Sequence, residues 1–144
     1  MDIQRFLDGF FTANNIKFVP GTKAVQNLFE NTSVIMPNQL YFFCDPIQRQ
    51  VKRSRDGSYT GQKATINFAF VTNSDLDMPY MNENVNTINK YTNNIEPIIN
   101  KWNLFVKKLA CTLTVTNESY TDIINIKDVN FDGLIGQITL ETYD

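Results

Sequence analysis

Apolar residues in the first thirty positions follow helical and strand-like spacings over short stretches. From Ile3 to Phe11 they recur at helical intervals, and Asp2 stands where a helix N-cap belongs. This pattern predicts a short helix that ends at Asn14-Asn15. The apolar run from Ile16 to Val19 predicts a brief extended segment before a Pro-Gly turn. A second short helix is predicted from Thr22 to Phe29.

The middle of the chain has the alternation that is typical of β-strands. Gln39 to Val51 is rich in aromatic and β-branched residues, and Pro46 predicts that this strand is bulged or lies at a sheet edge. Asp56-Gly57 is a strong signal for a hairpin turn. Gln62 to Thr72 then alternates again and is predicted to be the returning strand.

The longest regular pattern predicts a helix from about Asn82 to Leu109. Its apolar stripe has alternating steps of three and four and consists of Val85, Ile88, Ile95, Ile99, Trp102, Val106 and Leu109. Pro97 lies inside the pattern, where it removes one backbone hydrogen bond and clashes with the carbonyl of Asn93. One kinked helix is favoured because the stripe stays in phase. Two abutting helices, with Asn94 capping the second, are the alternative.

The last third of the chain is predicted to be β-structure. Cys111 to Val115 alternates, and two further strands, Ile123 to Val129 and Leu134 to Tyr143, are predicted to join at a turn over Asn130 to Gly133. The element order indicates an α+β fold, with an antiparallel sheet, one long kinked helix packed on one face and short N-terminal helices. With 144 residues and no linker-like segment, residues 1–144 are predicted to form a single domain.

Composition narrows the possible functions. The chain has no histidine, which removes the commonest general base and the commonest zinc ligand. No Gly-rich phosphate loop or partnered carboxylate pair appears, so we predict no catalytic residues and no cofactor. A net charge of −2 does not favour global attraction to nucleic acid. We predict that Cys44 and Cys111 are buried free thiols, since each stands in an apolar strand-like run. Neither a signal-peptide pattern nor a membrane-length apolar stretch is present, so no membrane partner is expected.

One segment matches the opening of a calcium-binding loop. Asp128, Asn130 and Asp132 occupy positions 1, 3 and 5, and Gly133 occupies position 6. Position 12 is Thr139, so the bidentate carboxylate that completes such a loop is missing. The flanking segments also have strand patterns, and a hairpin turn is therefore favoured over a metal site.

The predicted central hairpin is strongly basic. Its cations are Arg49, Lys52, Arg53, Arg55 and Lys63, with Tyr59 among them. Such a ribbon could contact a neighbouring subunit, contact a phosphate backbone, or carry charges that only deter edge-to-edge aggregation. A complementary acidic surface is predicted around Asp75, Asp77 and Glu83. A basic ribbon and an acidic segment on one subunit suit head-to-tail assembly, which can close into rings.

From about Gln39 onward the chain resembles a family of phage proteins. The resemblance lies in the strand Ala64 to Val71, the polar bend with Asp75 and Asp77, the long helix and the final hairpin from Gly133 to Glu141. It is a resemblance to the head–tail joining and tail-completion (neck) proteins of tailed bacteriophages, including those of crAss-like phages. Pro97 within the long helix departs from the family pattern.

The resemblance implies a virion structural protein that is made in the cytoplasm of a bacterial host. Such proteins are head–tail connectors or tail terminators that form homo-oligomeric rings around the DNA channel. Portal, other neck and tail proteins would be the partners, with non-specific contact to packaged DNA. The protruding contact hairpin would be Arg49 to Lys63. A small ligand- or calcium-binding accessory domain that uses Asp128 to Gly133 is the alternative.

Overall fold

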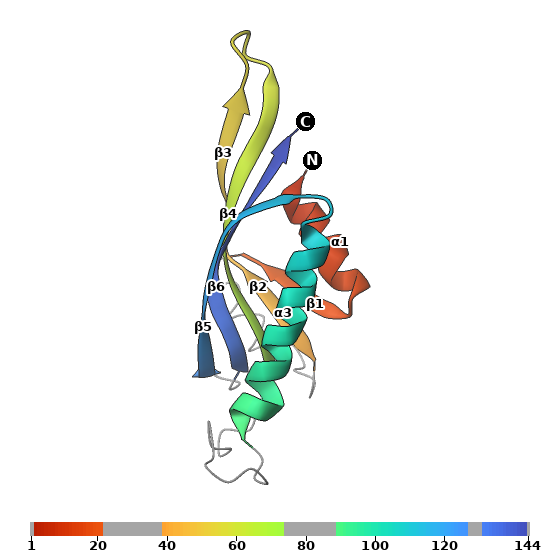
Figure 1. The fold of residues 1–144 in the computed structure, drawn as a ribbon, viewed down its shortest axis with the longest axis vertical. Helices are drawn as coiled ribbons and strands as arrows, with labels where there is room; N and C mark the ends of the chain where they lie inside the picture. The colour runs from red at the N-terminus through yellow and green to blue at the C-terminus, as the bar shows by residue number, and fades with distance from the viewer. Residues whose placement is uncertain (1, 22–38, 74–88, 127–130, 144) are drawn as a thin grey trace.

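The computed structural model describes residues 2–21, 39–73, 89–126 and 131–143, which form a twisted sheet with helices on one face (Figure 1). The elements are α1 (Ile3–Ala13), β1 (Ile16–Pro20), β2 (Leu40–Cys44), β3 (Gln48–Arg53), β4 (Tyr59–Asn73), the π-helical turn η1 (Tyr91–Ile95), α3 (Glu96–Leu109), β5 (Thr114–Ile126) and β6 (Phe131–Tyr143). The predicted α+β class and a long helix that ends at Leu109 are confirmed, whereas the start of that helix as predicted, from Asn82 to Ile88, lies outside the described residues. The second short helix predicted from Thr22 to Phe29 lies outside the described residues.

The first helix forms as its sequence indicates. The Asp2 side chain caps it by accepting a hydrogen bond from the backbone N–H of Arg5 at 3.2 Å. Asn14 ends the helix, and Asn15 adopts a left-handed backbone conformation with φ 59°. Asparagine tolerates that conformation better than most residues, which lets the chain turn directly into β1.

The sheet has the strand order β1-β2-β4-β6-β5, and β3 also pairs with β4. Every neighbouring pair is antiparallel except β1 and β2, which are parallel. The prediction of a purely antiparallel sheet is therefore wrong at this edge. Parallel neighbours need a crossover of a dozen or more residues, and the chain between β1 and β2 is long enough to provide one.

The ladder between β4 and β6 lies at the centre of the sheet. It runs without a register shift from the pair Gly61–Tyr143 to the pair Asn73–Phe131. On its other edge, β4 pairs first with β3 and then with β2. At the junction, residues 45–47 stand opposite only residues 66 and 67 of β4. This confirms the irregularity predicted at Pro46 and divides the predicted strand in two.

Aromatic side chains attach both helices to one face of the sheet. The ring of Phe11 from α1 stacks on that of Phe42 at a centroid distance of 4.2 Å. Trp102 from α3 is fully buried and stacks on Phe68 at 4.5 Å. The neighbours of Phe42 in sequence, Tyr41 and Phe43, belong to a smaller buried cluster with Phe131 on the opposite face. The consecutive aromatic residues of β2 therefore fill two cores.

The long helix begins with a π-helical turn just before Pro97. In this turn the backbone N–H of Glu96 bonds to the carbonyl of Tyr91, five residues earlier. The backbone hydrogen bonds of the helix thus change from the α to the π pattern next to Pro97, which has no backbone N–H to donate. Ile95, Trp102 and Leu109 of the predicted stripe are buried, and Ile98 and Phe105 are buried beside them, whereas Ile99 and Val106 are only partly buried.

The alternative in which Asn94 caps a second, abutting helix is wrong. The Oδ1 of Asn89 instead accepts from the backbone N–H of Thr92 at 2.8 Å, and Asn94 uses its side-chain amide elsewhere. A cap at Asn94 has no place in a helix that continues through it. The helix start is therefore fixed five residues earlier than the capping alternative supposed.

A fully buried ion pair joins the start of this helix to the start of β6. The Lys90 ammonium lies 3.0 Å and 3.2 Å from the two carboxylate oxygens of Asp132, and both side chains have 0% exposure. The Nδ2 of Asn94 donates to the same carboxylate at 3.0 Å. Removing one of these two charges would take a close, buried counter-ion from the other, which is costly.

The turn predicted over Asn130 to Gly133 is wrong, because β6 already begins at Phe131. Gly133 lies within the sheet, opposite Val71 on one side and Ile123 on the other. A Cβ at this position would lie 2.2 Å from the carbonyl oxygen of Phe70. The glycine therefore permits a close approach of two strands and does not mark a turn.

The two cysteines differ from each other. Cys44 is buried as predicted, and burial, with a smaller effect of the Asp45 carboxylate, raises the pKa of its thiol to about 12. Cys111 is exposed, so that prediction is wrong. Its apolar neighbours do not start a strand, because α3 continues to Leu109 and a turn follows. Leu113 closes this turn by donating its N–H to the carbonyl of Leu109 at 2.8 Å.

Replacing Lys90 by Met should lower the free energy of unfolding by about 3–5 kcal/mol, since the Asp132 carboxylate loses its buried counter-ion. The double variant Lys90→Met/Asp132→Leu should recover most of this loss, because the two opposite charges of the pair are removed together. Urea unfolding followed by circular dichroism measures both. Lys101→Met, on the exposed side of α3, is the matched control. A Lys90→Met loss no larger than that of the control would contradict the assignment.

Candidate functional site

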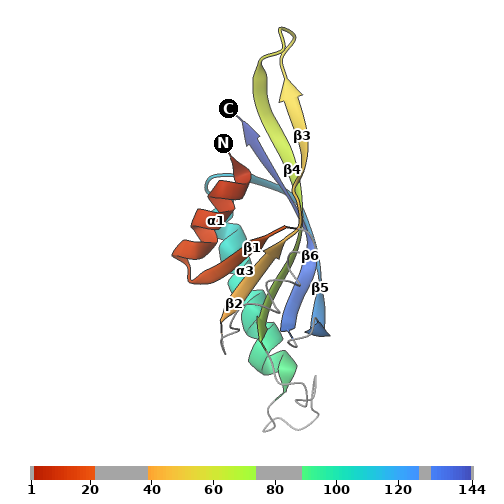
Figure 2. The same ribbon diagram turned by 180° about the vertical axis from the view of Figure 1, so that it is seen from behind.

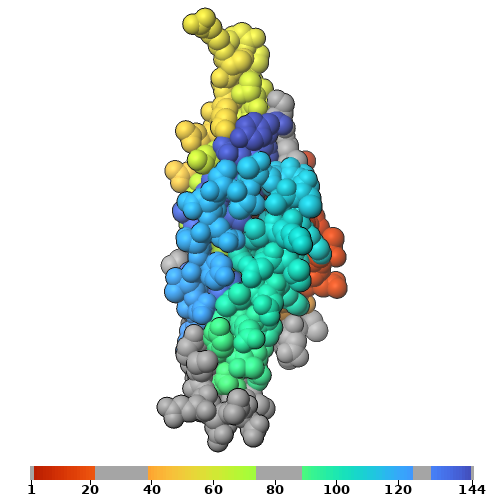
Figure 3. Space-filling model, in the orientation of Figure 1, coloured from red at the N-terminus to blue at the C-terminus, as the bar shows by residue number. Residues whose placement is uncertain are grey.

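The most prominent surface feature is the hairpin of β3 and β4. We call its residues 49–63 the arm; they coincide with the basic segment identified in the sequence. The tip of the arm extends beyond both helices and beyond the end of β6 (Figures 1 and 2). In the space-filling view it projects alone from a body that is covered by α3 and β5 (Figure 3). Its position makes it accessible to a partner from several sides.

The tip of the arm is fixed by its own hydrogen bonds. Ser54 and Ser58 close the turn by a backbone bond of 2.9 Å, and Gly57 donates to the Ser54 carbonyl at 3.0 Å. The Asp56 carboxylate accepts from the Ser54 hydroxyl and from the Ser58 N–H. These bonds lower the pKa of Asp56 to about 2, with the Ser54 hydroxyl as the largest cause. Arg53 donates to the Gly57 carbonyl at 3.1 Å.

The base of the arm is attached to the end of β6. The Lys52 ammonium lies 2.6 Å from the Glu141 carboxylate and 4.9 Å from the centre of the Tyr143 ring. The hydrogen bond between Lys52 and Glu141 raises the pKa of the lysine and lowers that of the carboxyl. Lys52, predicted as a contact residue, is therefore already engaged within its own subunit.

The remaining cations of the arm lie on both faces of the ribbon. Arg49 pairs with Ala64, whose side chain faces the helices, whereas Lys63 lies on the opposite face with Thr65. Within the part of the chain that the structure describes, Arg49, Arg55 and Lys63 make no ion pair. Tyr59 stands opposite Arg53 and is 38% exposed. The predicted patch thus exists as a two-sided ribbon.

The acidic residues predicted to complement the arm, Asp75, Asp77 and Glu83, lie outside the described residues. Two other acidic residues that the sequence reading missed stand on the outer strand β5. Glu118 accepts a hydrogen bond from the indole Nε1 of Trp102 at 2.8 Å, and Asp122 follows four residues later. An even spacing of two carboxylates within a strand pattern is the signal that could have identified them.

A shallow polar depression of about 610 Å³ lies on the sheet face opposite the helices. Its lining consists of Gln48, Gln50, Lys63, Thr65, Asn117, Gln137 and Thr139, and Arg49, whose strand position is on the helix-covered face, also borders it. Amides and hydroxyls dominate, and no carboxylate borders it. Such a surface can form hydrogen bonds with a partner, but it has no acid–base pair for proton transfer.

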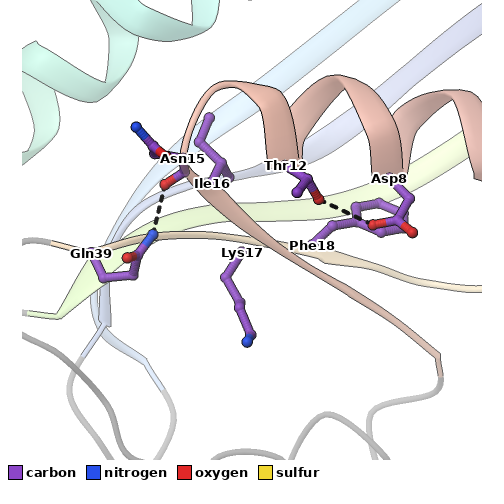
Figure 4. A pocket seen from close by; sticks show the side chains of 7 residues that line it. All are labelled: Asp8, Thr12, Asn15, Ile16, Lys17, Phe18 and Gln39. Carbon is purple, nitrogen blue, oxygen red and sulfur yellow. Dashed lines mark hydrogen bonds between the residues drawn. The ribbon is translucent and has the colours of Figure 1, made fainter.

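A second cleft, of about 370 Å³, lies between α1 and β1 (Figure 4). Gln39 closes one end by donating to the carbonyl of Asn15 at 2.7 Å, and Asp8 accepts from the Thr12 hydroxyl at 3.3 Å. The Lys17 side chain extends away from Asp8 (Figure 4). The cleft therefore does not bring together groups that could act as an acid and a base.

Of the three candidate calcium ligands, only Asp132 is among the described residues, and Lys90 and Asn94 bind its carboxylate. Asp128 and Asn130 lie outside them. The described residues hold no group of three or more potential metal-binding Cys, Asp or Glu side chains. No helix among the residues that the structure places is long and apolar enough to cross a membrane.

Comparison of the chain with protein-family models, curated protein sequences and solved structures gave no match.

Replacing Ser54 by Ala should raise the pKa of Asp56 from about 2 toward its ordinary value of 3.8, since the largest stabilising bond to the carboxylate is lost. The lowered pKa implies a stabilisation of the turn that is fully present above pH 3.8 and disappears as the pH falls toward 2. NMR titration of the Asp56 carboxyl carbon measures both values. An unperturbed pKa in the unsubstituted protein would contradict a pre-formed tip.

Proposed function

We propose that this chain is a non-enzymatic virion structural protein of a tailed bacteriophage. In this proposal it is a ring-forming subunit of the neck or tail, as a head–tail connector or tail terminator. It assembles with copies of itself and with portal and tail proteins around the DNA channel. The arm makes the contacts between subunits.

The observation that supports this proposal is the construction of the arm. A flexible loop would lose conformational entropy on binding, whereas a hairpin held by a closed tip and an anchored base is already ordered. The bonds around Asp56 order the tip, and the contact of Lys52 with Glu141 orders the base. An arm that is ordered before binding favours a function in which subunits repeat one contact with a defined geometry.

The surface chemistry of the arm favours a protein partner over DNA. Val51 is 48% exposed and lies between Arg49 and Arg53 on the same strand. An exposed apolar residue between two cations suits a protein surface with an apolar centre and acidic flanks. Contact with a phosphate backbone requires cations but gains nothing from the valine. The net charge of −2 also does not favour binding to DNA.

Replacing Arg53 and Arg55 by Glu should abolish self-association, because the arm would then repel an acidic partner surface. Light scattering over a concentration series measures the assembly, and circular dichroism checks that the subunit remains folded. The double variant Lys101→Glu/Lys107→Glu makes the same charge change on the exposed side of α3, and it should assemble normally. A monomeric unsubstituted chain at every concentration, or normal assembly of the Arg53→Glu/Arg55→Glu variant, would contradict the proposal.

A further inference from the structure

Among the described strands, β1, β3 and β5 each pair on one side only, and β3 and β5 carry opposite charge. Among the described residues, β5 pairs only with β6, and β3 pairs only with β4 (Figure 2). Each strand therefore presents a row of backbone N–H and C=O groups along its outer side. Such an edge is a template for another strand unless its side chains prevent pairing.

On β5, two carboxylates and a tyrosine share the face that the helices cover. Glu118 stands opposite Ile138 and Asp122 stands opposite Leu134, and both of these β6 residues belong to the core beneath the helices. Tyr120 lies between them and packs partly against the same core. No basic residue occurs from Thr114 to Ile126. This edge is therefore acidic on its helix-covered face.

On β3, two cations and a valine have the same spacing. Arg49 pairs with Ala64, a core residue on the helix-covered face, and alternation places Val51 on that face too. Arg53 follows a register shift after Lys52 and pairs with Tyr59. The spacing of four residues between Arg49 and Arg53 equals the spacing between Glu118 and Asp122. The two edges are therefore complementary in charge and in spacing.

We propose that β3 of one copy pairs with β5 of a second copy and so continues the sheet from subunit to subunit. The two strands run in opposite directions within one sheet, so a second copy in the same orientation presents an antiparallel neighbour. In one register Val51 lies opposite Tyr120, Arg49 opposite Asp122 and Arg53 opposite Glu118. This inference rests on the proposed function and names a second copy of the chain as the partner of the arm.

The charges also discriminate against the competing pairings. Two β5 strands that pair about Tyr120 would place Glu118 opposite Asp122, and two β3 strands that pair about Val51 would place Arg49 opposite Arg53. Like charges directly opposite each other destabilise a strand pair. The contact is thus heterologous, between two different edges, as an assembly into rings requires.

The stepped outline of the sheet leaves room for this strand. In the described ranges no strand pairs with the outer side of β3, whereas β1 pairs with β2 up to Pro20–Cys44. In the proposed register, the end of β5 at Ile126 comes level with Asp45. The incoming strand therefore stops where β1 begins to occupy the edge.

The register also sets the offset between copies. Val51 pairs with Gln62 of β4, which in turn pairs with Thr142 of β6. Tyr120 of β5 pairs with Gly136, six residues before Thr142 on β6. Pairing Val51 with Tyr120 therefore moves the second copy along the strands by about six residues, roughly 20 Å. Each copy adds four strand positions across, also roughly 20 Å. Because the displacement along the strands equals the width added across them, the strands would be tilted by about 45° to the axis of a ring, close to the tilt in closed barrels.

Thiol cross-linking tests the register directly. In a Cys111→Ser background, the Val51→Cys and Tyr120→Cys variants are mixed and treated with a short bis-maleimide. The contact predicts cross-linked dimers in the mixture and none with either variant alone. Lys101→Cys mixed with Tyr120→Cys is the control and should give none. Dimers of the Val51→Cys variant alone, or no cross-link in the mixture, would overturn the proposed contact.

Charge exchange tests the ion pairs. Arg49→Asp or Asp122→Arg alone should weaken self-association by about tenfold, because each places like charges opposite each other. The double variant Arg49→Asp/Asp122→Arg should restore it. Arg49→Asp/Glu96→Arg has the same net charge but keeps the repulsion at Asp122, so it should remain weak. Equal behaviour of the two double variants in light scattering would contradict the pairing.

The failure of this contact can be told from the failure of the proposed function. If the unsubstituted chain assembles in light scattering but the mixture gives no cross-link, subunits meet elsewhere and only the contact is wrong. If it neither assembles nor cross-links, both proposals are contradicted. If duplex DNA shields the thiol of the Val51→Cys variant from modification and no cross-link forms, β3 binds nucleic acid at this edge. That result would also overturn the proposed contact.

Discussion

The continuous antiparallel ladder between β4 and β6 is the constraint on which the other elements depend. Its register is unbroken from Gly61–Tyr143 to Asn73–Phe131, and a strand pair alternates its side chains between two faces along its whole length. One half of the ladder carries large apolar residues on the helix-covered face and accepts the helices. Toward its other end the ladder continues past the helices, so the same two strands that support the core also support the base of the arm.

Two polar contacts fix the opposite ends of this ladder. At one end, the buried pair of Lys90 and Asp132 holds the start of the long helix against the start of β6. At the other end, Lys52 contacts Glu141 and lies over Tyr143, which holds β3 against the end of β6. The first contact is buried and specifies how the helix enters the core. The second is partly exposed and orders a surface element, so the two differ in the cost of losing one partner.

The sequence predicted the elements well where the local pattern and the tertiary contacts agree. Asp2 caps α1, Pro46 interrupts the strand, and Asp56-Gly57 forms the tip of the arm. The sequence misled where a residue serves a distant contact. The Asp132-Gly133 sequence is typical of a turn, but Gly133 lies within the sheet, where its lack of a side chain allows close contact with the Phe70 carbonyl. Asp132 resembles a calcium ligand, but it binds a lysine 42 residues away in sequence.

The candidate site was only partly predictable for the same reason. The basic residues of the arm are contiguous in sequence and could be found by charge patterning. The complementary carboxylates at Glu118 and Asp122 are ordinary in sequence, and they gain meaning only because β5 is the outer strand. Which strand lies at an edge is decided by long-range pairing, which local residue patterns do not encode.

Hydrogen–deuterium exchange of dilute and concentrated protein tests most directly the claim that this chain acts through contacts between its sheet edges. Backbone amides exchange slowly when a second strand accepts their hydrogen bonds. The account predicts that concentration protects Gln48 to Arg53 and Glu118 to Asp122, while exchange in α3 stays unchanged. Protection that appears with concentration only outside these two strands, or no protection at any concentration, would contradict it.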